Sequence, residues 1–279
     1  MFTRPHKPAA RGLTVCARCE RDKPRCAICQ TPMPSPRVEL NICAACLREG
    51  LRCRACGARI RGKFLMLNGN DGPYCEKCHR DHALCDLCGA PASARAVLYA
   101  DGRVVCQRCA QTAITDPRQA EMLFDRVVDL VGATLGLRLN VHPRLMLVDH
   151  ARLGELARHA VAENGHDSAK TLGLFARMGR KRVVYVQEFL PRILLIQVAA
   201  HEFAHAWQGE NAPLLRDPVW REGFAEWVAY HALTRLDAPK KAAQMIQRRD
   251  VYGEGLRRVL EAEKQKGIDG VLQECRNAR

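Results

Sequence analysis

The sequence predicts an α+β protein in which an array of small zinc-binding β-hairpin modules precedes a mainly helical domain with a small sheet. Two observations lead to this prediction. Fourteen of the fifteen cysteines lie before position 110, all in Cys-x-x-Cys pairs, and the rest of the chain alternates apolar helical periodicity with short β-branched runs. A chain of 279 residues also has room for one or two domains with a sizeable core.

Residues 1–15 contain Pro, Arg and Lys without apolar periodicity, and we expect them to form a disordered lead. They lack the apolar core of a signal peptide, and no apolar run reaches the roughly eighteen residues of a membrane span. We therefore expect no contact with a membrane. Because zinc-binding thiols must stay reduced, we expect the protein in the cytoplasm.

The cysteines from Cys16 to Cys109 form seven Cys-x-x-Cys pairs. A zinc knuckle needs this two-residue gap so that two thiolates can reach one ion. Disulfide frameworks do not repeat a two-residue gap seven times. A redox-active Cys-x-x-Cys motif could account for a single pair, but not for seven pairs in series. Residues 16–111 are therefore predicted to be a zinc-binding array.

The spacing between successive pairs alternates, with gaps of six, thirteen, six, eighteen, six and seventeen residues. Two knuckles that share a zinc usually enclose a short β-hairpin, which fits the longer gaps. The prediction is three structural zinc sites, formed by Cys26, Cys29, Cys43 and Cys46, by Cys53, Cys56, Cys75 and Cys78, and by Cys85, Cys88, Cys106 and Cys109.

The opposite pairing, across the six-residue gaps, leaves Cys106 and Cys109 alone and little chain for a hairpin. In the preferred pairing Cys16 and Cys19 have no partners, and the sequence leaves open whether they are the remnant of a lost module or recruit His6. Residues 62–74 and 95–105 support the preferred pairing, since each has the pattern strand, Gly-containing turn, strand.

His79 and His82 flank the second site, but its four cysteines suffice, so we expect both histidines to face solvent. The net charge of +14 permits an anionic partner such as nucleic acid. However, the array has only Phe64, Tyr74 and Tyr99 as aromatic residues, too few for a base-stacking platform. We therefore favour a protein-binding array over a nucleic-acid-binding one.

Residues 112–119 mark the start of the second domain, predicted to span 112–279, since Asp116-Pro117 forms a helix N-cap and first turn. The elements predicted next are a helix from Asp116 to about Gly136, a strand over 144–148, a helix over 149–162 and a strand over 182–187.

The stretch Ala200–Trp207 contains the pattern His-Glu-x-x-His. On a helix, His201 and His205 lie one turn apart and can bind one zinc ion, and Glu202 is placed to take a proton from a water at that zinc. The surrounding run from Leu190 is apolar nearly all round, as in a buried helix, and buried polar groups are costly unless a metal satisfies them. The alternative is a pair of core histidines bonded to the backbone.

A catalytic zinc usually has a third protein ligand. Glu222 is the candidate, on a helix predicted from about Pro218 to Leu236. Glu226, one turn later, is predicted to hydrogen-bond one of the ligand histidines, His201. His231 competes as third ligand, but it points to nearly the opposite face of the helix from Glu222.

These motifs resemble the glutamate-zinc peptidases, or gluzincins, and more closely the plant LIM-domain peptidases that limit organ size, the DA-one family, with their shorter bacterial relatives. The similar stretches are Thr171–Leu174, Val183–Val186, Leu190–Leu194, Ala200–Glu202, Glu222–Gly223 and Asp250–Arg257. The resemblance implies LIM-like zinc modules before a zincin-like metallopeptidase domain. A LIM module, however, joins its two zinc sites by two residues and usually includes histidine, and Gln is expected at the position of Glu226.

The predicted function is that of a zinc-dependent endopeptidase that hydrolyses peptide bonds in protein substrates, with one catalytic zinc and about three structural ones. Glu202 is the predicted general base, and Tyr252, or else Tyr230, the donor to the oxyanion. The array would recruit substrates or regulators. The alternative is a non-catalytic zinc-finger protein that binds protein or nucleic acid and has a metal-stabilised scaffold domain.

Overall fold

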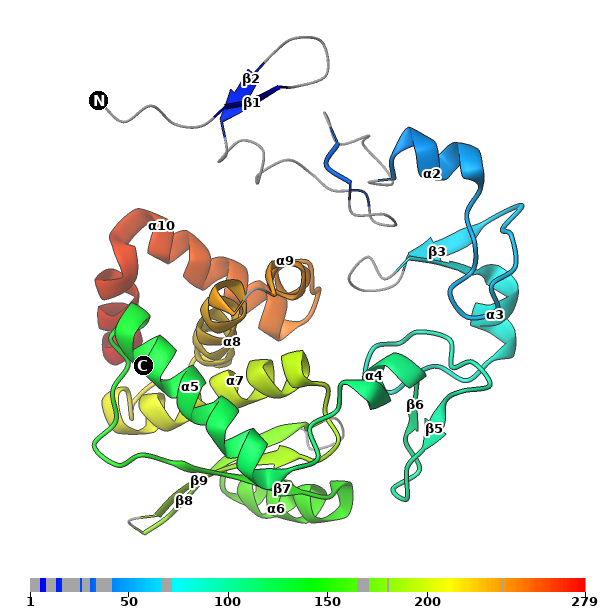
Figure 1. Ribbon diagram of the computed structural model, residues 1–279. Helices are drawn as coiled ribbons and strands as arrows, with labels where there is room; N and C mark the ends of the chain where they lie inside the picture. Colours follow the sequence, from blue (N-terminus) through cyan, green and yellow to red (C-terminus); the bar gives the residue numbers. More distant parts are fainter. Residues whose placement is uncertain are drawn as a thin grey trace. The chain divides into compact units, whose positions relative to one another are not determined.

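The computed structural model describes residues 6–8, 14–16, 26, 31–33, 42–66, 72–164, 171–179, 181–236 and 238–278. It is an α+β structure with small sheets, as predicted (Figure 1). The chain divides into two compact units, Met1–Arg95 and Ala96–Arg279. The boundary predicted at residue 112 lies C-terminal to this division.

The first unit consists of short elements. Its strands and helices are β1 (His6–Pro8), β2 (Thr14–Cys16), α2 (Ala44–Glu49), β3 (Phe64–Met66), β4 (Pro73–Cys75) and α3 (Glu76–Asp81). β1 pairs antiparallel with β2, within the segment predicted to be a disordered lead. β3 pairs antiparallel with β4, which confirms the hairpin predicted over residues 62–74.

The apolar core described for the first unit is small. Its buried members Cys26, Met33, Ile42 and Leu51 are packed against partly buried side chains that include Phe64. One of these core residues is itself a cysteine of the predicted zinc sites. A core of this size is small compared with the conformational entropy of ordering the chain, so we expect bound metal ions to contribute to the folding of this unit.

The second unit carries the long helices and the largest sheet. Its elements are β5 (Val97–Leu98), β6 (Val104–Val105), α4 (Gln107–Gln111), α5 (Pro117–Leu135), β7 (Arg144–Val148), α6 (His150–Asn164), β8 (Gly173–Met178), β9 (Lys181–Gln187), α7 (Arg192–Asn211), α8 (Pro218–Arg235), α9 (Pro239–Ile246) and α10 (Val251–Asn277). The sheet has the order β7-β9-β8, with β9 parallel to β7 and antiparallel to β8.

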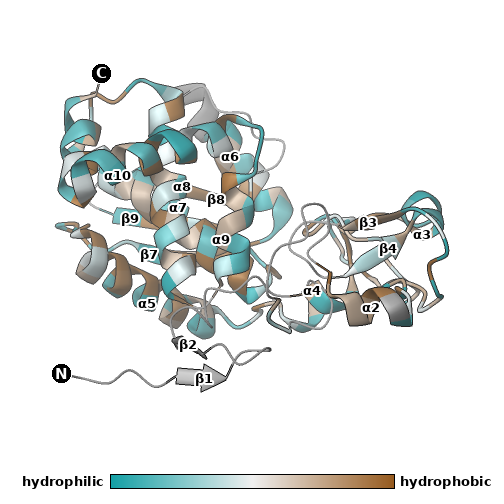
Figure 2. Ribbon diagram, turned by 90° about the horizontal axis from the view of Figure 1, so that it is seen from above, coloured by the Kyte–Doolittle hydropathy of each residue, from teal (hydrophilic) through white to brown (hydrophobic). Residues whose placement is uncertain are grey.

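The helices and strands predicted between residues 116 and 236 are present. Asp116 caps α5 by accepting a hydrogen bond from the Arg118 N–H, and Gly136 ends the helix in the left-handed conformation. α7 is buried nearly all round, as its apolar sequence predicted. The sequence did not reveal β8, α9 or α10; hydrophilic residues dominate the visible face of α10 (Figure 2).

The β5–β6 hairpin packs on the connection between β9 and α7. Arg103 at its turn is only 8% exposed, lies 2.7 Å from the Asp101 carboxylate and donates to the Glu188 carbonyl over 3.3 Å. The Tyr99 ring stacks on the Phe189 ring with centroids 4.8 Å apart. This connection therefore enters α7 in a defined position.

Helices α8 and α10 approach each other closely at two glycines. A Cβ at Gly255 would lie 2.3 Å from the Val219 carbonyl oxygen and 2.6 Å from the Gly223 Cα. Both distances are far below van der Waals contact, so only glycine fits. This crossing holds the first turn of α10 against the helix that carries Glu222.

We expect Gly255→Ala to destabilise the second unit by at least about 2 kcal/mol, because the added methyl group must push two backbones apart. Gly132→Ala in α5 is the control, since a Cβ there meets its nearest heavy atom at 3.5 Å and should be neutral or stabilising by up to about 1 kcal/mol. Thermal unfolding followed by circular dichroism measures both. Equal melting temperatures would contradict the crossing.

Candidate metal centres

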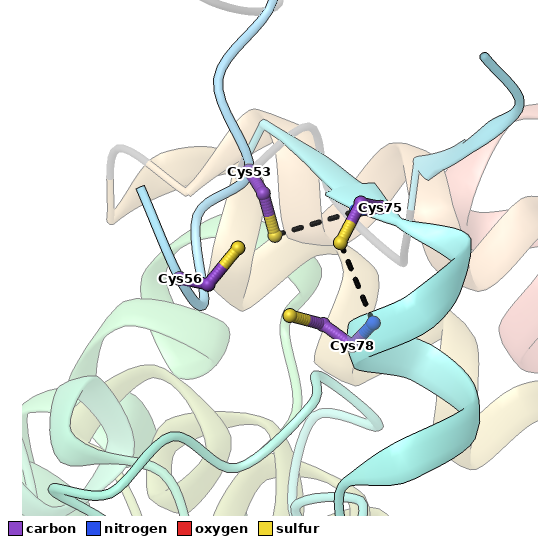
Figure 3. A group of neighbouring side chains, drawn as sticks. All are labelled: Cys53, Cys56, Cys75 and Cys78. Atoms are coloured by element: carbon purple, nitrogen blue, oxygen red, sulfur yellow. Dashed lines mark hydrogen bonds between the residues drawn. The ribbon is translucent and has the colours of Figure 1, made fainter. Parts of the chain in front are cut away.

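The cysteines of the first unit converge as the predicted pairing requires. The sulfur atoms of Cys53, Cys56, Cys75 and Cys78 all lie within 4.8 Å of one another. Figure 3 shows their side chains pointing toward a common centre, two from a loop and two from the junction of β4 and α3. Four converging thiols, two of them buried, are the donor set of a structural zinc site.

Local backbone geometry builds this cysteine group. The Gly57 N–H donates to the Cys53 carbonyl over 2.8 Å in a turn that needs the positive φ of Gly57, +73°. Cys75 caps α3, accepting from the Cys78 N–H over 3.4 Å, and its own N–H donates to the Cys53 sulfur over 3.3 Å.

Hydrogen bonds from the backbone also shift the pKa of one of these thiols, Cys53. Burial acts to raise the pKa of the Cys53 thiol, but hydrogen bonds from the backbone of Cys75, Cys56 and Ala55 outweigh it and lower this pKa to about 6. The lowered pKa favours the thiolate, which is the form of cysteine that binds zinc, whereas burial raises the pKa of the Cys78 thiol in the same group.

The same turn recurs along the chain. The Gly89 N–H donates to the Cys85 carbonyl over 2.8 Å, as the Gly57 N–H does to that of Cys53. The N–H groups of Cys53, Cys85 and Cys26 also make matching bonds, to the carbonyls of Ala58, Ala90 and Thr31 over 2.9, 2.8 and 2.9 Å. Short helices likewise begin directly after Cys43 and Cys106. Similar turns and short helices thus accompany the cysteines of each predicted site.

Two further groups complete the set. One contains Cys85, Cys88, Cys106 and Cys109, and the other Cys26, Cys43 and Cys46. The Cys26 and Cys46 sulfurs are 3.9 Å apart, close to the roughly 3.8 Å expected between two thiolates on a tetrahedral zinc. Cys29 and Cys19, with the side chain of Cys16, lie outside the described residues. His79 and His82 belong to none of the groups found among the described residues.

A different donor set lies in the second unit, between α7 and α8. The Nε2 atoms of His201 and His205 are 3.1 Å apart, and the Glu222 Oε2 atom lies 3.3 Å from the first and 3.5 Å from the second. Ligands bound to a tetrahedral zinc at 2.0–2.1 Å lie about 3.3 Å from one another. The three atoms thus have the mutual spacing of zinc ligands.

The donor set also fits a divalent cation electrostatically. Burial acts to raise the pKa of the Glu222 carboxyl, but the adjacent His205 and His201 lower it well below its usual range. Glu222 is 6% exposed, and Glu202 and Glu226 beside it are 8% and 4% exposed. Arg221 lies 3.4 Å from the Glu222 carboxylate and Arg248 lies 3.6 Å from that of Glu226, and a bound zinc would add positive charge among the three buried carboxylates.

Each histidine is oriented by a second side chain. The Glu226 Oε1 atom lies 3.2 Å from the His201 Nδ1 atom, on the ring side away from Glu222. Gln208 Oε1 lies 2.8 Å from His205 Nδ1, and the Gln208 amide donates to the Arg221 carbonyl over 2.9 Å. An acceptor at Nδ1 favours the tautomer in which Nε2 is the metal-binding nitrogen; Gln208 forms this hydrogen bond with His205, and Glu226 lies within ion-pair distance of His201.

Glu202 does not join the triangle of ligands. Its Oε2 atom accepts a hydrogen bond from the Phe175 N–H of β8 over 2.8 Å. A Cβ at Gly173 would lie 2.9 Å from the Glu202 Cγ atom and 3.2 Å from its Oε1, so glycine lets the strand approach this side chain. The backbone of β8 therefore holds Glu202 beside the three ligands.

Tyr252 lies in the first turn of α10, with its ring centroid 5.9 Å from that of His201. The Arg248 guanidinium lies 4.6 Å from the Tyr252 ring centroid and 3.6 Å from the Glu226 carboxylate. The alternative third ligand, His231, and the alternative oxyanion donor, Tyr230, have other contacts. His231 is 3.1 Å from the Glu263 carboxylate, and the Tyr230 ring packs edge-on against His231.

Sequence reasoning missed Gln208, Arg248 and the Phe175 N–H. Gln208 follows His205 by three positions on one helix, a spacing that could have identified it. Arg248 and Phe175 carry no such signal, because they lie in other elements far along the chain.

Comparisons with models of protein families, with curated proteins and with solved structures found no match. A search of the described residues also found no helix long and apolar enough to cross a membrane.

Proposed function

We propose that this protein is a zinc-dependent endopeptidase that hydrolyses peptide bonds in protein substrates. The observation that carries the proposal is the triangle of His201, His205 and Glu222 atoms, 3.1 to 3.5 Å apart, with Glu202 held beside it. A purely structural metal site needs no free carboxylate at its edge, whereas hydrolysis needs a base there. The resemblance to the zincin-like DA-one peptidases supports the same proposal.

The residues divide the chemistry among them. A bound zinc would supply a Lewis acid that activates water and polarises the scissile carbonyl. Glu202 takes a proton from the attacking water and delivers it to the leaving amine. The hydrogen bond from Phe175 keeps one carboxylate oxygen in place, so that the other is directed at the reacting groups.

Further residues position the reacting groups. Tyr252, tilted over His201 and packed against Arg248, would donate its hydroxyl proton in a hydrogen bond to the developing oxyanion. Glu226 and Gln208 hold the two histidine rings in the ligand tautomer.

The cysteine groups have a separate role in this proposal. Each would hold a structural zinc, and the array would bind a protein substrate or regulator rather than nucleic acid. A cytoplasmic location is part of the proposal, because the thiolates must remain reduced.

Elemental analysis of the purified protein tests the metal site. We expect about four zinc ions per chain, and one fewer in His201→Ala/His205→Ala, because that variant removes two of the three ligands. His142→Ala/His150→Ala, which removes two exposed histidines, should keep the full content. Equal zinc in all three proteins would contradict the site.

Activity is tested on an unbiased mixture of peptides, with new termini identified by mass spectrometry. We expect cleavage by the native protein and none by His201→Ala/His205→Ala. Loss of one zinc from the variant together with no cleavage by either protein would favour the alternative, a metal-stabilised scaffold in a binding protein.

A further inference from the structure

A second concave site lies in the second unit, at the ends of α7 and α8 that are remote from the proposed zinc ligands. The pocket is partly open to solvent and has a volume of about 160 Å³. It is lined by residues of α5, α7 and α8 and of the segment after α8, which are Arg126, Arg192, Ile193, Ile196, Leu233, Arg235, Leu236 and Ala238. None of them takes part in the proposed catalytic chemistry.

Three arginines line this pocket. Arg126, Arg192 and Arg235 are exposed, and none of the described lining residues is acidic. Within the described part of the chain none of the three forms an ion pair. By contrast, Arg248 and Arg258 of the same unit each lie 2.7 or 2.8 Å from a carboxylate. Three guanidinium groups around one hollow repel one another, so an anionic ligand would be stabilised there.

The floor of the pocket is apolar. Ile196 and Leu233 are buried in the core below it, whereas Ile193 at the rim is 46% exposed, one of the large apolar side chains of this unit left open to water. A small inorganic anion would use the arginines but leave Ile193 exposed. A ligand that uses both needs carboxylates on either side of an apolar group.

We infer that this pocket binds an acidic peptide segment, whose carboxylates pair with the three arginines and whose apolar side chain packs on Ile193. Guanidinium groups suit this role because each can donate two parallel hydrogen bonds to one carboxylate. Net charge supports the choice of an acidic partner, since the chain carries a formal charge of +14.

The position of the pocket indicates what kind of partner it binds. Arg192 and Ile196 lie on nearly the opposite face of α7 from His201 and His205, because successive residues of a helix are about 100° apart around its axis. The pocket therefore opens away from the proposed zinc ligands, and the acidic segment would belong to a protein partner rather than to the chain that is cut. The inference does not depend on the proposed peptidase function.

Fluorescence anisotropy with a labelled peptide tests the binding. The probe is a short peptide of aspartate and glutamate around a central leucine, added to the full-length zinc-loaded protein. We expect Arg126→Glu and Arg192→Glu each to weaken binding about tenfold, because each places a like charge beside the ligand. Arg138→Glu, an equal charge change at an exposed residue outside the pocket, should leave the affinity within about twofold.

Two altered probes separate the contributions. Replacing the acids by glutamine should abolish binding, and replacing the leucine by glycine should weaken it severalfold. Affinity that is unchanged by Arg126→Glu and Arg192→Glu would overturn the inference, as would displacement of the probe by an equal concentration of inorganic phosphate. Ile193→Ser provides a second variant that keeps every charge, and it should weaken only the leucine-containing probe.

Binding and catalysis can be told apart. His201→Ala/His205→Ala should bind the acidic probe with native affinity, since the pocket shares no residue with the metal site. If this variant and the native protein both bind but neither cleaves any peptide, the peptidase proposal fails and the pocket stands. If the native protein cleaves peptides but does not bind the acidic probe, the inference about the pocket fails and the peptidase proposal stands.

Discussion

Glu202→Gln should lower peptidase activity by about 10²- to 10⁴-fold while leaving the zinc content unchanged, because proton transfer by a positioned carboxylate contributes a factor of this size. The amide has nearly the same shape, and its oxygen can still accept the hydrogen bond from Phe175. It cannot take a proton from water at neutral pH. Structure and metal are thus retained, and only the base is lost.

The measurement combines zinc analysis with cleavage rates for the best substrate found in the peptide mixture. Glu155→Gln makes the same chemical change at an exposed position of α6 and should keep full activity. Native rates in Glu202→Gln would remove Glu202 from the mechanism. Loss of zinc would instead show that this carboxylate helps to hold the metal.

Cys53→Ser/Cys78→Ser should release one zinc ion and unfold the module around it. Binding of a structural zinc is worth about 10–16 kcal/mol at neutral pH, more than a module with so small a core can lose. The backbone N–H groups of Cys75 and Cys78 that donate to sulfur would also lose their arrangement. We expect the module to become sensitive to limited proteolysis.

Two controls accompany this variant. Cys275→Ala removes a buried thiol that belongs to none of the described metal groups, and it should keep the full zinc content. Cleavage of short peptides should survive Cys53→Ser/Cys78→Ser, since the proposed catalytic ligands His201, His205 and Glu222 form a separate group. A native zinc count in the serine variant would disprove the predicted grouping of the cysteines.

Much of the metal chemistry was predictable because it depends on residues close in sequence. His201 and His205 share a helix face by their spacing alone, and each Cys-x-x-Cys turn is a local structure. Glu222 was predictable as a ligand candidate, but its distances of 3.3 and 3.5 Å to the two histidines come from the packing of α8 against α7.

Helix α10 and strand β8 could not be predicted from the amino-acid sequence. The segment of α10 contains Gly253 and Gly255, which disfavour a helix by intrinsic propensity. Tertiary packing overrides this preference, because glycine alone allows α10 to cross α8 at Gly223. β8 is an edge strand in which Leu174, Phe175 and Ala176 are only partly buried, and it contains none of the β-branched residues that identified β9.

The residues that can bind metal were identifiable from the amino-acid sequence, since local geometry sets the spacing of two ligands along a helix or a turn. Their surroundings depend on tertiary packing. It brings the Phe175 N–H to Glu202, Arg248 to Tyr252, and three arginines from different helices to one pocket. These contacts join elements distant in the chain, and burial of the apolar faces of the helices and sheet, rather than local spacing, sets where such elements meet.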